Sequence, residues 1–298
     1  MKDKLLQSAK LAKSYQVDSG KRFHLKEIDP ADTQGLDLKG EADDLLKKGV
    51  EQLSDLQQKL YAQNHWALLL IFQGMDASGK DGAIRHVMSG VNPQGCQVYS
   101  FKAPSSEELN HDFLWRTSKC LPERGRIGIF NRSYYEEVLI TRVHPDVLAR
   151  EPMPPELKGK HIWKERFEDI NAFERYLTRN GTVVRKFFLH ISKEEQKRRF
   201  LSRIDDPEKN WKFSEGDAHE REFWDAYMHA YQDMIRHTAS QEAPWYVVPA
   251  DHKWFTRLVI ASVIIKTLED LKLAYPAVDQ RKKRELERAR EVLLSEPS

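Results

Sequence analysis

A glycine-rich segment of nine residues combines the residue types that are needed to hold a phosphate group. The segment Gly74-Met-Asp-Ala-Ser-Gly-Lys-Asp-Gly82 has the Gly-x-x-x-x-Gly-Lys spacing of a phosphate-binding loop. Its glycines let the backbone wrap closely around an oxyanion, and the loop amides and the start of the following helix offer positive partial charge. Lys80 adds a mobile cation. We therefore predict phosphate contacts from Gly74, Met75, Ala77, Ser78, Gly79, Lys80, Asp81 and Gly82.

The carboxylates around this loop predict a magnesium site of unusual composition. Asp81 stands where such loops carry the Ser or Thr that binds magnesium, and Asn131 ends a strand where many of these enzymes carry an acid. Magnesium prefers carboxylate oxygens to an amide oxygen. We predict that Asp76, inside the loop, and Glu136 supply the missing negative charge and bind Mg²⁺. Alternatively, Glu136 only opens the next helix, where acids are favoured.

Basic residues outside the loop form two further candidate phosphate contacts. Arg132 follows Asn131 and is predicted to brace a phosphate, with a structural ion pair as the alternative. Residues 197–213 hold six basic residues among seventeen, which predicts a lid that closes over the transferring phosphates and excludes water. A solvated helix face is the alternative for this segment. The predicted lid contacts are Arg198, Arg199, Arg203, Lys209 and Lys212, and Trp211 and Phe213 are expected to anchor the lid's return to the body.

A third group of polar residues follows the second predicted strand. In nucleoside monophosphate kinases this region carries the acceptor, so Lys102, Asp112 and Arg116, together with Asn131, are candidate nucleotide contacts. Ordinary surface charge is the alternative for the basic members of this group.

The elements that must position these residues alternate between strands and helices. Apolar runs predict strands at 66–73, 97–102, 126–131, 182–191 and 245–249. Helical patterns lie between them, at 39–61, 81–88, 106–119, 134–143, 164–180, 193–203, 219–238 and 253–273. This alternation implies parallel pairing and right-handed crossovers. We expect an α/β fold of three layers with a five-stranded parallel sheet.

Composition narrows the class of protein. The chain has 298 residues, of which 40% are hydrophobic and 32% charged, and its net charge is only +2, which argues against a dedicated nucleic-acid-binding protein. The longest apolar cluster, at 258–265, is too short to cross a membrane, and the N-terminus lacks the apolar core of a signal peptide. We expect a cytoplasmic protein with neither a nucleic-acid nor a membrane partner.

The domain organisation is expected to be simple. We predict one domain over 1–298, with an N-terminal extension and helix at 1–62, a lid at 193–218 and a C-terminal helical tail at 276–298. The tail mixes acidic and basic residues, so a solvated or packed helix is favoured over an RNA-binding arm.

Three of these motifs together resemble the polyphosphate kinase 2 family. They are the loop at 74–82, the strand end Phe130-Asn-Arg-Ser133 and the segment Asp206-Pro-Glu-Lys-Asn-Trp-Lys-Phe213, and the likeness extends from about residue 18 to about residue 273. The resemblance implies a thymidylate-kinase-like P-loop kinase fold with a helical lid. It also implies transfer of the terminal phosphate of inorganic polyphosphate to a nucleotide with Mg²⁺.

The resemblance also assigns roles to individual residues. Asp76 matches the magnesium-binding aspartate of the family, Lys80 its Walker A lysine and Arg132 its phosphate-binding arginine, while Arg199 and Arg203 both fall in the arginine region of the lid. Asn131 followed by Glu136 is similar to the class III subgroup, which accepts nucleoside mono- and diphosphates. The implied activity makes ADP from AMP and ATP from ADP, with guanine nucleotides as further candidates, in a homodimer or homotetramer.

Two other functions stay open on the sequence. One is an ATP-dependent kinase for nucleotides or small molecules, because the sequence does not exclude an adenine pocket near the lid. The other is a non-enzymatic module that binds polyphosphate or nucleotides, with Asn131 marking lost catalysis.

Overall fold

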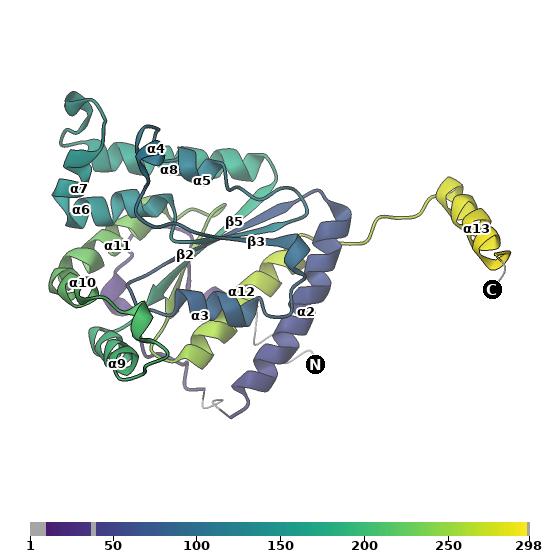
Figure 1. Cartoon of the computed structure of the whole chain (residues 1–298), viewed down its shortest axis with the longest axis horizontal. Coiled ribbons are helices and arrows are strands. Elements are labelled where there is room, and N and C mark those ends of the chain that lie inside the picture. The colour runs from purple at the N-terminus through teal and green to yellow at the C-terminus, as the bar shows by residue number, and fades with distance from the viewer. Residues whose placement is uncertain (1–9, 37–39, 297–298) are drawn as a thin grey trace.

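A six-stranded sheet forms the centre of the computed structural model, which describes residues 10–36 and 40–296 (Figure 1). The strand order across the sheet is β1-β6-β5-β2-β4-β3, and β2 to β6 all run parallel to one another. The strands are β1 (Gln16–Val17), β2 (Ala67–Gln73), β3 (Cys96–Ser100), β4 (Ile127–Asn131), β5 (Thr182–His190) and β6 (Trp245–Pro249). The predicted five-stranded parallel sheet is therefore present, with one strand added.

The added strand β1 comes from the N-terminal extension, in which no strand was predicted. Gln16 and Val17 pair antiparallel with Tyr246 and Trp245 of β6. An uncovered edge strand presents unpaired backbone groups, and β1 satisfies some of those of β6. Tyr15 is buried beside this pairing, and its carbonyl accepts a hydrogen bond from the amide of Val247. Two paired residues are too few to give a recognisable alternation in sequence.

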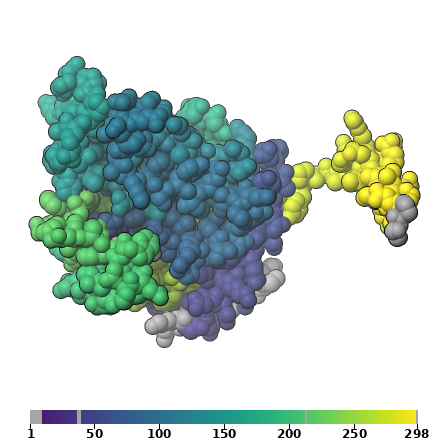
Figure 2. Space-filling model, in the orientation of Figure 1, coloured from purple at the N-terminus to yellow at the C-terminus, as the bar shows by residue number. Residues whose placement is uncertain are grey.

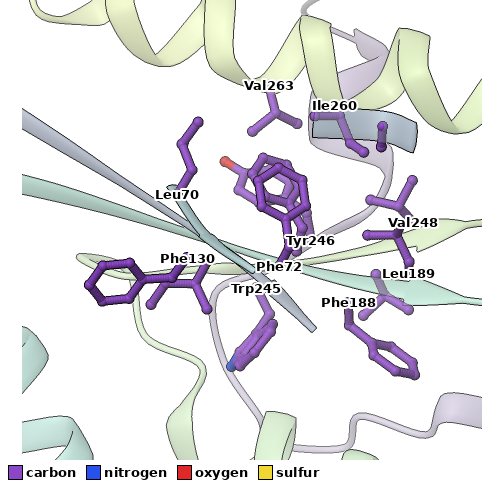
Figure 3. Close-up of a cluster of buried hydrophobic side chains, with 14 of the residues drawn as sticks. Leu70, Phe72, Phe130, Phe188, Leu189, Trp245, Tyr246, Val248, Ile260 and Val263 are labelled. Atoms are coloured by element: carbon purple, nitrogen blue, oxygen red, sulfur yellow. The ribbon is translucent and has the colours of Figure 1, made fainter. Parts of the chain in front are cut away.

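Strand β2 is buried on both faces along its whole length, as its unbroken apolar run predicts. Figure 3 shows how neighbouring side chains divide between the two faces of the sheet. Tyr246 points to the side of Ile260 and Val263, whereas Trp245 points to the opposite side (Figure 3). The sheet thus has a core on each face, which is the three-layer arrangement that was predicted.

Long helices cover both faces of the sheet (Figure 1). One face is covered by α2 (Ala42–Gln63), α3 (Lys80–Val87) and α12 (Lys253–Asp270), which pack on one another. The other carries α8 (Ile162–Arg179) and α11 (Trp224–Thr238). The apolar stripe of α2 faces inward, and the helix ends at Asn64, whose φ of 52° is left-handed.

Three predicted helices are interrupted in the structure. The helix expected at 106–119 is two single turns, α4 (Ser106–Leu109) and α5 (Trp115–Ser118), because the carboxylate of Asp112 accepts from the amide of Leu114 and forms a turn. The helix expected at 134–143 is a 3₁₀ segment, η3 (Tyr134–Val138), followed by α6 (Ile140–Val143). The helix expected at 219–238 begins as the 3₁₀ segment η6 (Glu220–Phe223) and continues as α11.

The remaining short elements join these layers. They are the helix α7 (Pro145–Arg150) and the 3₁₀ segments η1 (Leu25–Glu27), η2 (Pro93–Gly95) and η4 (Pro155–Leu157).

Two outer segments complete the chain. Residues 193–219 form α9 (Lys193–Ile204), η5 (Asn210–Lys212) and α10 (Glu215–His219). The last helix, α13 (Gln280–Leu294), stands apart from the body at the end of an extended segment (Figures 1 and 2). Within the described residues, every helix is too short or too polar to span a bilayer.

Candidate functional site

The glycine-rich loop connects β2 to α3 and has an unusual backbone. Gly74, Ala77 and Gly79 have φ values of 151°, 62° and 106°. A Cβ at Gly74 would lie 2.9 Å from the carbonyl oxygen of Leu189, and also 2.9 Å from the hydroxyl of Ser78. Only glycine fits this position, and the left-handed Ala77 is strained. The loop is therefore held in one shape by its surroundings.

Several amides of this loop are available for an anion. Among the described residues, the backbone N–H groups of Ala77, Gly79, Lys80 and Asp81 donate to no other protein group. Two of them lie in the first turn of α3, where the helix dipole adds positive potential. Consecutive free amides at a helix N-terminus form an oxyanion site. The loop therefore offers free donors at the place where the spacing predicts a phosphate contact.

Lys80 is buried beside this loop. Its amine donates to the carbonyl oxygens of Gly74 at 2.6 Å and Met75 at 3.2 Å. Burial lowers the pKa of Lys80 to about 8, the charge of Arg132 contributes in the same direction, and nearby acids such as Asp76 oppose both. The partners of the amine are thus neutral carbonyl oxygens, which an anionic phosphate oxygen could replace.

Asp76 and Arg132 meet across the end of the sheet. The loop follows β2 and Arg132 follows β4, and these strands are parallel neighbours, so both connections leave the same edge. The guanidinium of Arg132 donates to the carboxylate of Asp76 at 2.6 Å, and each side chain is more than a third exposed. Burial opposes ionisation of Asp76, but Lys80, Arg132 and Arg203 outweigh it and hold its pKa below the usual range.

Glu136 lies in η3 on the same side of the sheet. Its carboxylate accepts a hydrogen bond of 2.8 Å from the amide of Gln73, the last residue of β2. Its charge opposes the lowering of the pKa of Lys80 and contributes to the raised pKa of Arg132. Both predicted magnesium ligands therefore lie near the same two cations. Within the described residues, no group of three or more His, Cys, Asp or Glu side chains is arranged to hold a metal.

Asn131 pairs with the residue that replaces the usual Ser or Thr. Its side-chain amide donates to the carboxylate of Asp81 at 2.6 Å. A carboxylate only accepts, so the nitrogen of Asn131 must face Asp81. We predicted a nucleotide contact for Asn131 and a phosphate contact for Asp81, and no local pattern indicated that the two side chains would pair.

The two candidate lid arginines occupy different environments. Arg199 is buried in α9, and its guanidinium bonds Glu195 and the carbonyls of Ala77, Ser78, Ala250 and Asp251. Arg203, one turn further on, is only partly buried, and its charge contributes to the lowered pKa of Asp76.

The other predicted lid residues are more exposed. Arg198 pairs with Glu195 on α9, and Lys209 pairs with Asp206. The side chain of Lys212 lies outside the described part of the chain. Phe213 packs on Phe200, with ring centroids 5.4 Å apart, as expected for an anchor. The same prediction was wrong for Trp211, which is 78% exposed because it lies on the outer side of the short η5 turn.

Two of the predicted nucleotide contacts line a cavity of 280 Å³ between α4, α5 and the segment around Pro152. Arg116 and Asp112 belong to its wall, together with Glu137 and Glu151. Arg116 is itself buried and bonds Glu137 and the carbonyl of Lys102, whose own side chain is exposed. Burial raises the pKa of Glu137 to about 7, although Arg166 and Arg116 oppose the rise.

A larger open cavity of 800 Å³ runs along α9. Five acidic and two basic residues line it, so its charge does not favour a polyanion. Its lining is Ser192, Glu194, Glu195, Lys197, Arg198, Leu201, Ser202, Asp205, Asp206 and Asp251.

Sequence reasoning missed the side chains that hold the site in place. Gln73 ends an otherwise apolar strand, and this break in the pattern was a usable signal. Gln196 of α9 donates to the carbonyl of Asp76 at 3.0 Å. The two residues are 120 positions apart, so no local pattern connects them.

Comparison with known proteins places these features in one family. A sequence profile described as polyphosphate kinase 2 matches residues 37–276. An ADP-polyphosphate phosphotransferase from Rhodopseudomonas palustris is 54% identical over 287 residues, which cover 95% of this chain and 98% of that protein. An AMP/ADP-polyphosphate phosphotransferase from Meiothermus ruber is 43% identical over 265 residues, which cover 89% of this chain and 95% of that protein.

A solved structure agrees with the sequence comparison. The crystal structure of polyphosphate kinase 2 from Arthrobacter aurescens superimposes with a TM-score of 0.84 at 41% sequence identity. The match covers 93% of this chain and 95% of that one.

Proposed function

The chain belongs to the polyphosphate kinase 2 family, and from this premise we propose that it transfers the terminal phosphate of inorganic polyphosphate to AMP and ADP. The observation that carries the proposal is the set of free loop amides next to Lys80 and the Arg132–Asp76 pair. Such a set binds linked phosphates without requiring a base or a ribose. The names of relatives support both acceptors, since one acts on ADP and another on AMP and ADP.

The chain's own residues supply positioning and charge in this reaction. The amides of Ala77 to Asp81 bind the oxygens of the terminal phosphate, and Lys80 exchanges its carbonyl partners for a phosphate oxygen. Arg132 braces the phosphate from the side of β4, and Arg203 approaches from the lid. An anionic phosphate oxygen of the acceptor then attacks the terminal phosphorus in line, and the P–O bond to the rest of the polyphosphate breaks, so the chain leaves one phosphate shorter. The attacking oxygen is already anionic, so no strong general base is needed.

Asp76 and Glu136 would hold Mg²⁺. The fit is chemical: two carboxylates face the same cations, and the pKa of Asp76 is held low enough that it is ionised at neutral pH. Magnesium keeps several waters and substrate oxygens as ligands, which suits a site with two protein carboxylates. When bound, the ion neutralises charge on the phosphate oxygens.

The acceptor nucleoside is proposed to occupy the cavity of 280 Å³. Asp112 and Arg116 line it, and the predicted contact Asn131 lies at the end of β4, next to the phosphate loop. The guanidinium of Arg116 already bonds Glu137 and the carbonyl of Lys102. Arg116 therefore holds the wall of the cavity in place.

The wider organisation of the protein is also proposed. Residues 193–218 act as a lid over the single domain, the segment 1–62 packs as an N-terminal extension, and 276–298 is a tail. The assembly is a homodimer or homotetramer without nucleic-acid or membrane partners. It acts in the cytoplasm, where its acceptor nucleotides are made.

A donor assay tests the function directly. Purified protein with Mg²⁺ and either AMP or ADP is given long-chain polyphosphate or ATP as sole donor, and products are separated by chromatography. We expect ADP and ATP to form with polyphosphate, and Lys80→Ala to lower turnover by about 10²–10³-fold with the fold intact. Transfer from ATP alone would instead identify an ATP-dependent kinase, and tight polyphosphate binding without transfer would identify a binding module.

A further inference from the structure

The carbonyl oxygens of residues 74–78, in the first part of the phosphate loop, each accept a hydrogen bond from a side chain. Those of Gly74 and Met75 accept from Lys80, and that of Asp76 accepts from Gln196 at 3.0 Å. Those of Ala77 and Ser78 accept from Arg199, each at 2.9 Å. Because the C=O and N–H of a trans peptide point in opposite directions, fixing the carbonyl of Asp76 also fixes the amide of Ala77, which is free to bind an anion.

The donors to Asp76, Ala77 and Ser78 come from one face of one helix. Gln196 and Arg199 lie three positions apart in α9 and are 1% and 8% exposed. Arg199 also bonds Ala250 and Asp251, beyond the end of β6, so α9 is tied both to the loop and to the sheet. A strained residue such as Ala77 keeps its conformation only when its surroundings impose it, and α9 provides that constraint.

Gln196 has a second partner, which lies where the chain returns from the lid. Its side-chain oxygen accepts from the guanidinium of Arg221 at 2.7 Å, and the same nitrogen of Arg221 donates to the carbonyl of Lys193 at 3.0 Å. Arg221 belongs to η6, which follows α10 directly. Arg221 only donates and the carbonyl of Asp76 only accepts, so the orientation of the amide of Gln196 is determined at both ends.

We propose that Gln196 is a positioning residue that couples η6, the return segment of the lid, to the phosphate loop through Arg221. When the return segment of the lid is seated, Arg221 orients Gln196, and Gln196 holds the peptide of Asp76. When the segment is displaced, Gln196 loses its orientation and the peptide of Asp76 relaxes. The proposed magnesium ligand and the anion-binding amide of Ala77 then move together. This coupling rests on the proposed function, because it acts on residues that bind phosphate and metal there.

Three variants and a control separate this role from general stability. Arg221→Ala removes the contact on the lid side, Gln196→Leu removes both contacts, and the third variant combines them. Lys193→Ala is the control, because it removes an exposed cation near Arg221 but keeps the carbonyl to which Arg221 donates. Each protein is measured with polyphosphate and ADP for kcat and KM, for its melting temperature, and by hydrogen–deuterium exchange of residues 74–82.

The expected pattern is specific to coupling. Arg221→Ala and Gln196→Leu each lower kcat by about tenfold with smaller changes in KM, because small misplacements near reacting groups slow the reaction. Both speed amide exchange in 74–82 without a matching fall in melting temperature. The double variant resembles Gln196→Leu alone, since Arg221 acts through Gln196, and non-additivity of this kind marks contacting residues. Arg221→Lys, which keeps a cationic donor, falls between the wild type and Arg221→Ala.

Three outcomes would overturn the coupling. In the first, the double variant loses kcat by the product of the two single losses. In the second, amide exchange in 74–82 is the same in the variants as in the wild type. In the third, Arg221→Ala and Gln196→Leu lose no more activity than the control Lys193→Ala. If a leucine at 196 prevents folding, Gln196→Glu gives the same information, because it can accept from Arg221 but cannot donate to Asp76. The proposed function is judged separately, by whether the wild type and Lys193→Ala transfer phosphate from polyphosphate.

Discussion

At the scale of single residues, Arg199 and Arg203 show how two arginines of one helix acquire different roles. Arg199 has its guanidinium occupied by Glu195 and by four carbonyl oxygens, so it has little capacity left for a substrate. Arg203 is partly exposed and contributes to the field that ionises Asp76. Burial and partners therefore favour Arg203 as the arginine that meets the transferring phosphate.

Paired substitutions test this division. Arg199→Ala should lower the free energy of unfolding by about 3–5 kcal/mol, because Glu195 loses its buried partner and keeps only the exposed Arg198. Arg203→Ala should change stability by about 0.5 kcal/mol or less and lower kcat by about 10²–10³-fold. Urea unfolding and steady-state kinetics measure the two effects. A stable but inactive Arg199→Lys, beside an active Arg203→Ala, would reverse the assignment.

The buried amine of Lys80 predicts a pH dependence of activity. Its pKa of about 8 means that the cation needed for polyphosphate is lost as the pH rises through 8. We expect kcat/KM for polyphosphate, measured between about pH 6.5 and 9.5, to fall above pH 8, because this ratio reports the pKa of the free enzyme.

The effect of Lys80 on the free energy of unfolding has the opposite sign. A lysine whose pKa is lowered on folding opposes folding while it is charged, and this penalty is relieved above pH 8.

Lys80→Arg is the matched control for this profile, because an arginine stays charged over the whole range. It should lower activity overall but remove the fall above pH 8. The same fall in Lys80→Arg would show that another group titrates.

At the scale of elements, a buried polar cluster anchors η3, the segment that carries Glu136. The hydroxyls of Tyr134 and Tyr135 both bond one oxygen of Glu174 in α8, and Lys186 of β5 bonds the other at 2.6 Å. The amine of Lys186 has no exposed surface and also donates to the carbonyl of Thr238. Every partner is satisfied, so the cluster fixes how η3 leaves the sheet.

Breaking this cluster on one side should be costly. Lys186→Met leaves the carboxylate of Glu174 buried without its cation and should destabilise the protein by about 3–5 kcal/mol. Lys186→Met combined with Glu174→Gln removes both charges and should recover part of that loss. Urea unfolding compares the two variants. If the free energy of unfolding of the double variant falls below that of Lys186→Met by as much as Glu174→Gln alone lowers it, the two residues do not act as a pair.

At the scale of the whole molecule, α13 is the one described helix that stands away from the body in Figures 1 and 2. Leu286 and Leu293 lie on one side of it and are 51% and 66% exposed. An isolated helix of this length is marginal in water, so it needs a surface to pack on. The proposed homodimer or homotetramer would provide such a surface on a second copy.

Removal of the tail tests this contact. A protein lacking residues 276–298 should form smaller assemblies in light scattering after size-exclusion chromatography. Its kcat per subunit should stay within about twofold of the wild type, because α13 lies apart from the described site residues. Leu293→Asp should have the same effect on assembly, whereas Glu287→Gln, also on α13, should not. An unchanged mass for both the truncation and Leu293→Asp would exclude the tail as the contact.

The glycine-rich loop, the strand and helix that flank it, and the parallel sheet could all be predicted from sequence patterns. The loop spacing and the apolar run of β2 are local patterns imposed by backbone geometry, so both can be read without a structure. The likeness of the motifs to one family extended that reading to the reaction class, which the comparisons support.

The side chains that hold the loop, in contrast, could be identified only from contacts that form when the chain folds. Arg199 meets the carbonyl of Ala77 across 122 positions, and Gln196 meets Asp76 across 120. The strand β1 and the interrupted helices likewise depend on partners that lie far away in sequence or on single turn-forming side chains. The physical reason is that a side-chain donor acts on whichever acceptor lies opposite it in the folded protein. The spacing of nearby residues carries no information about an acceptor more than a hundred positions away.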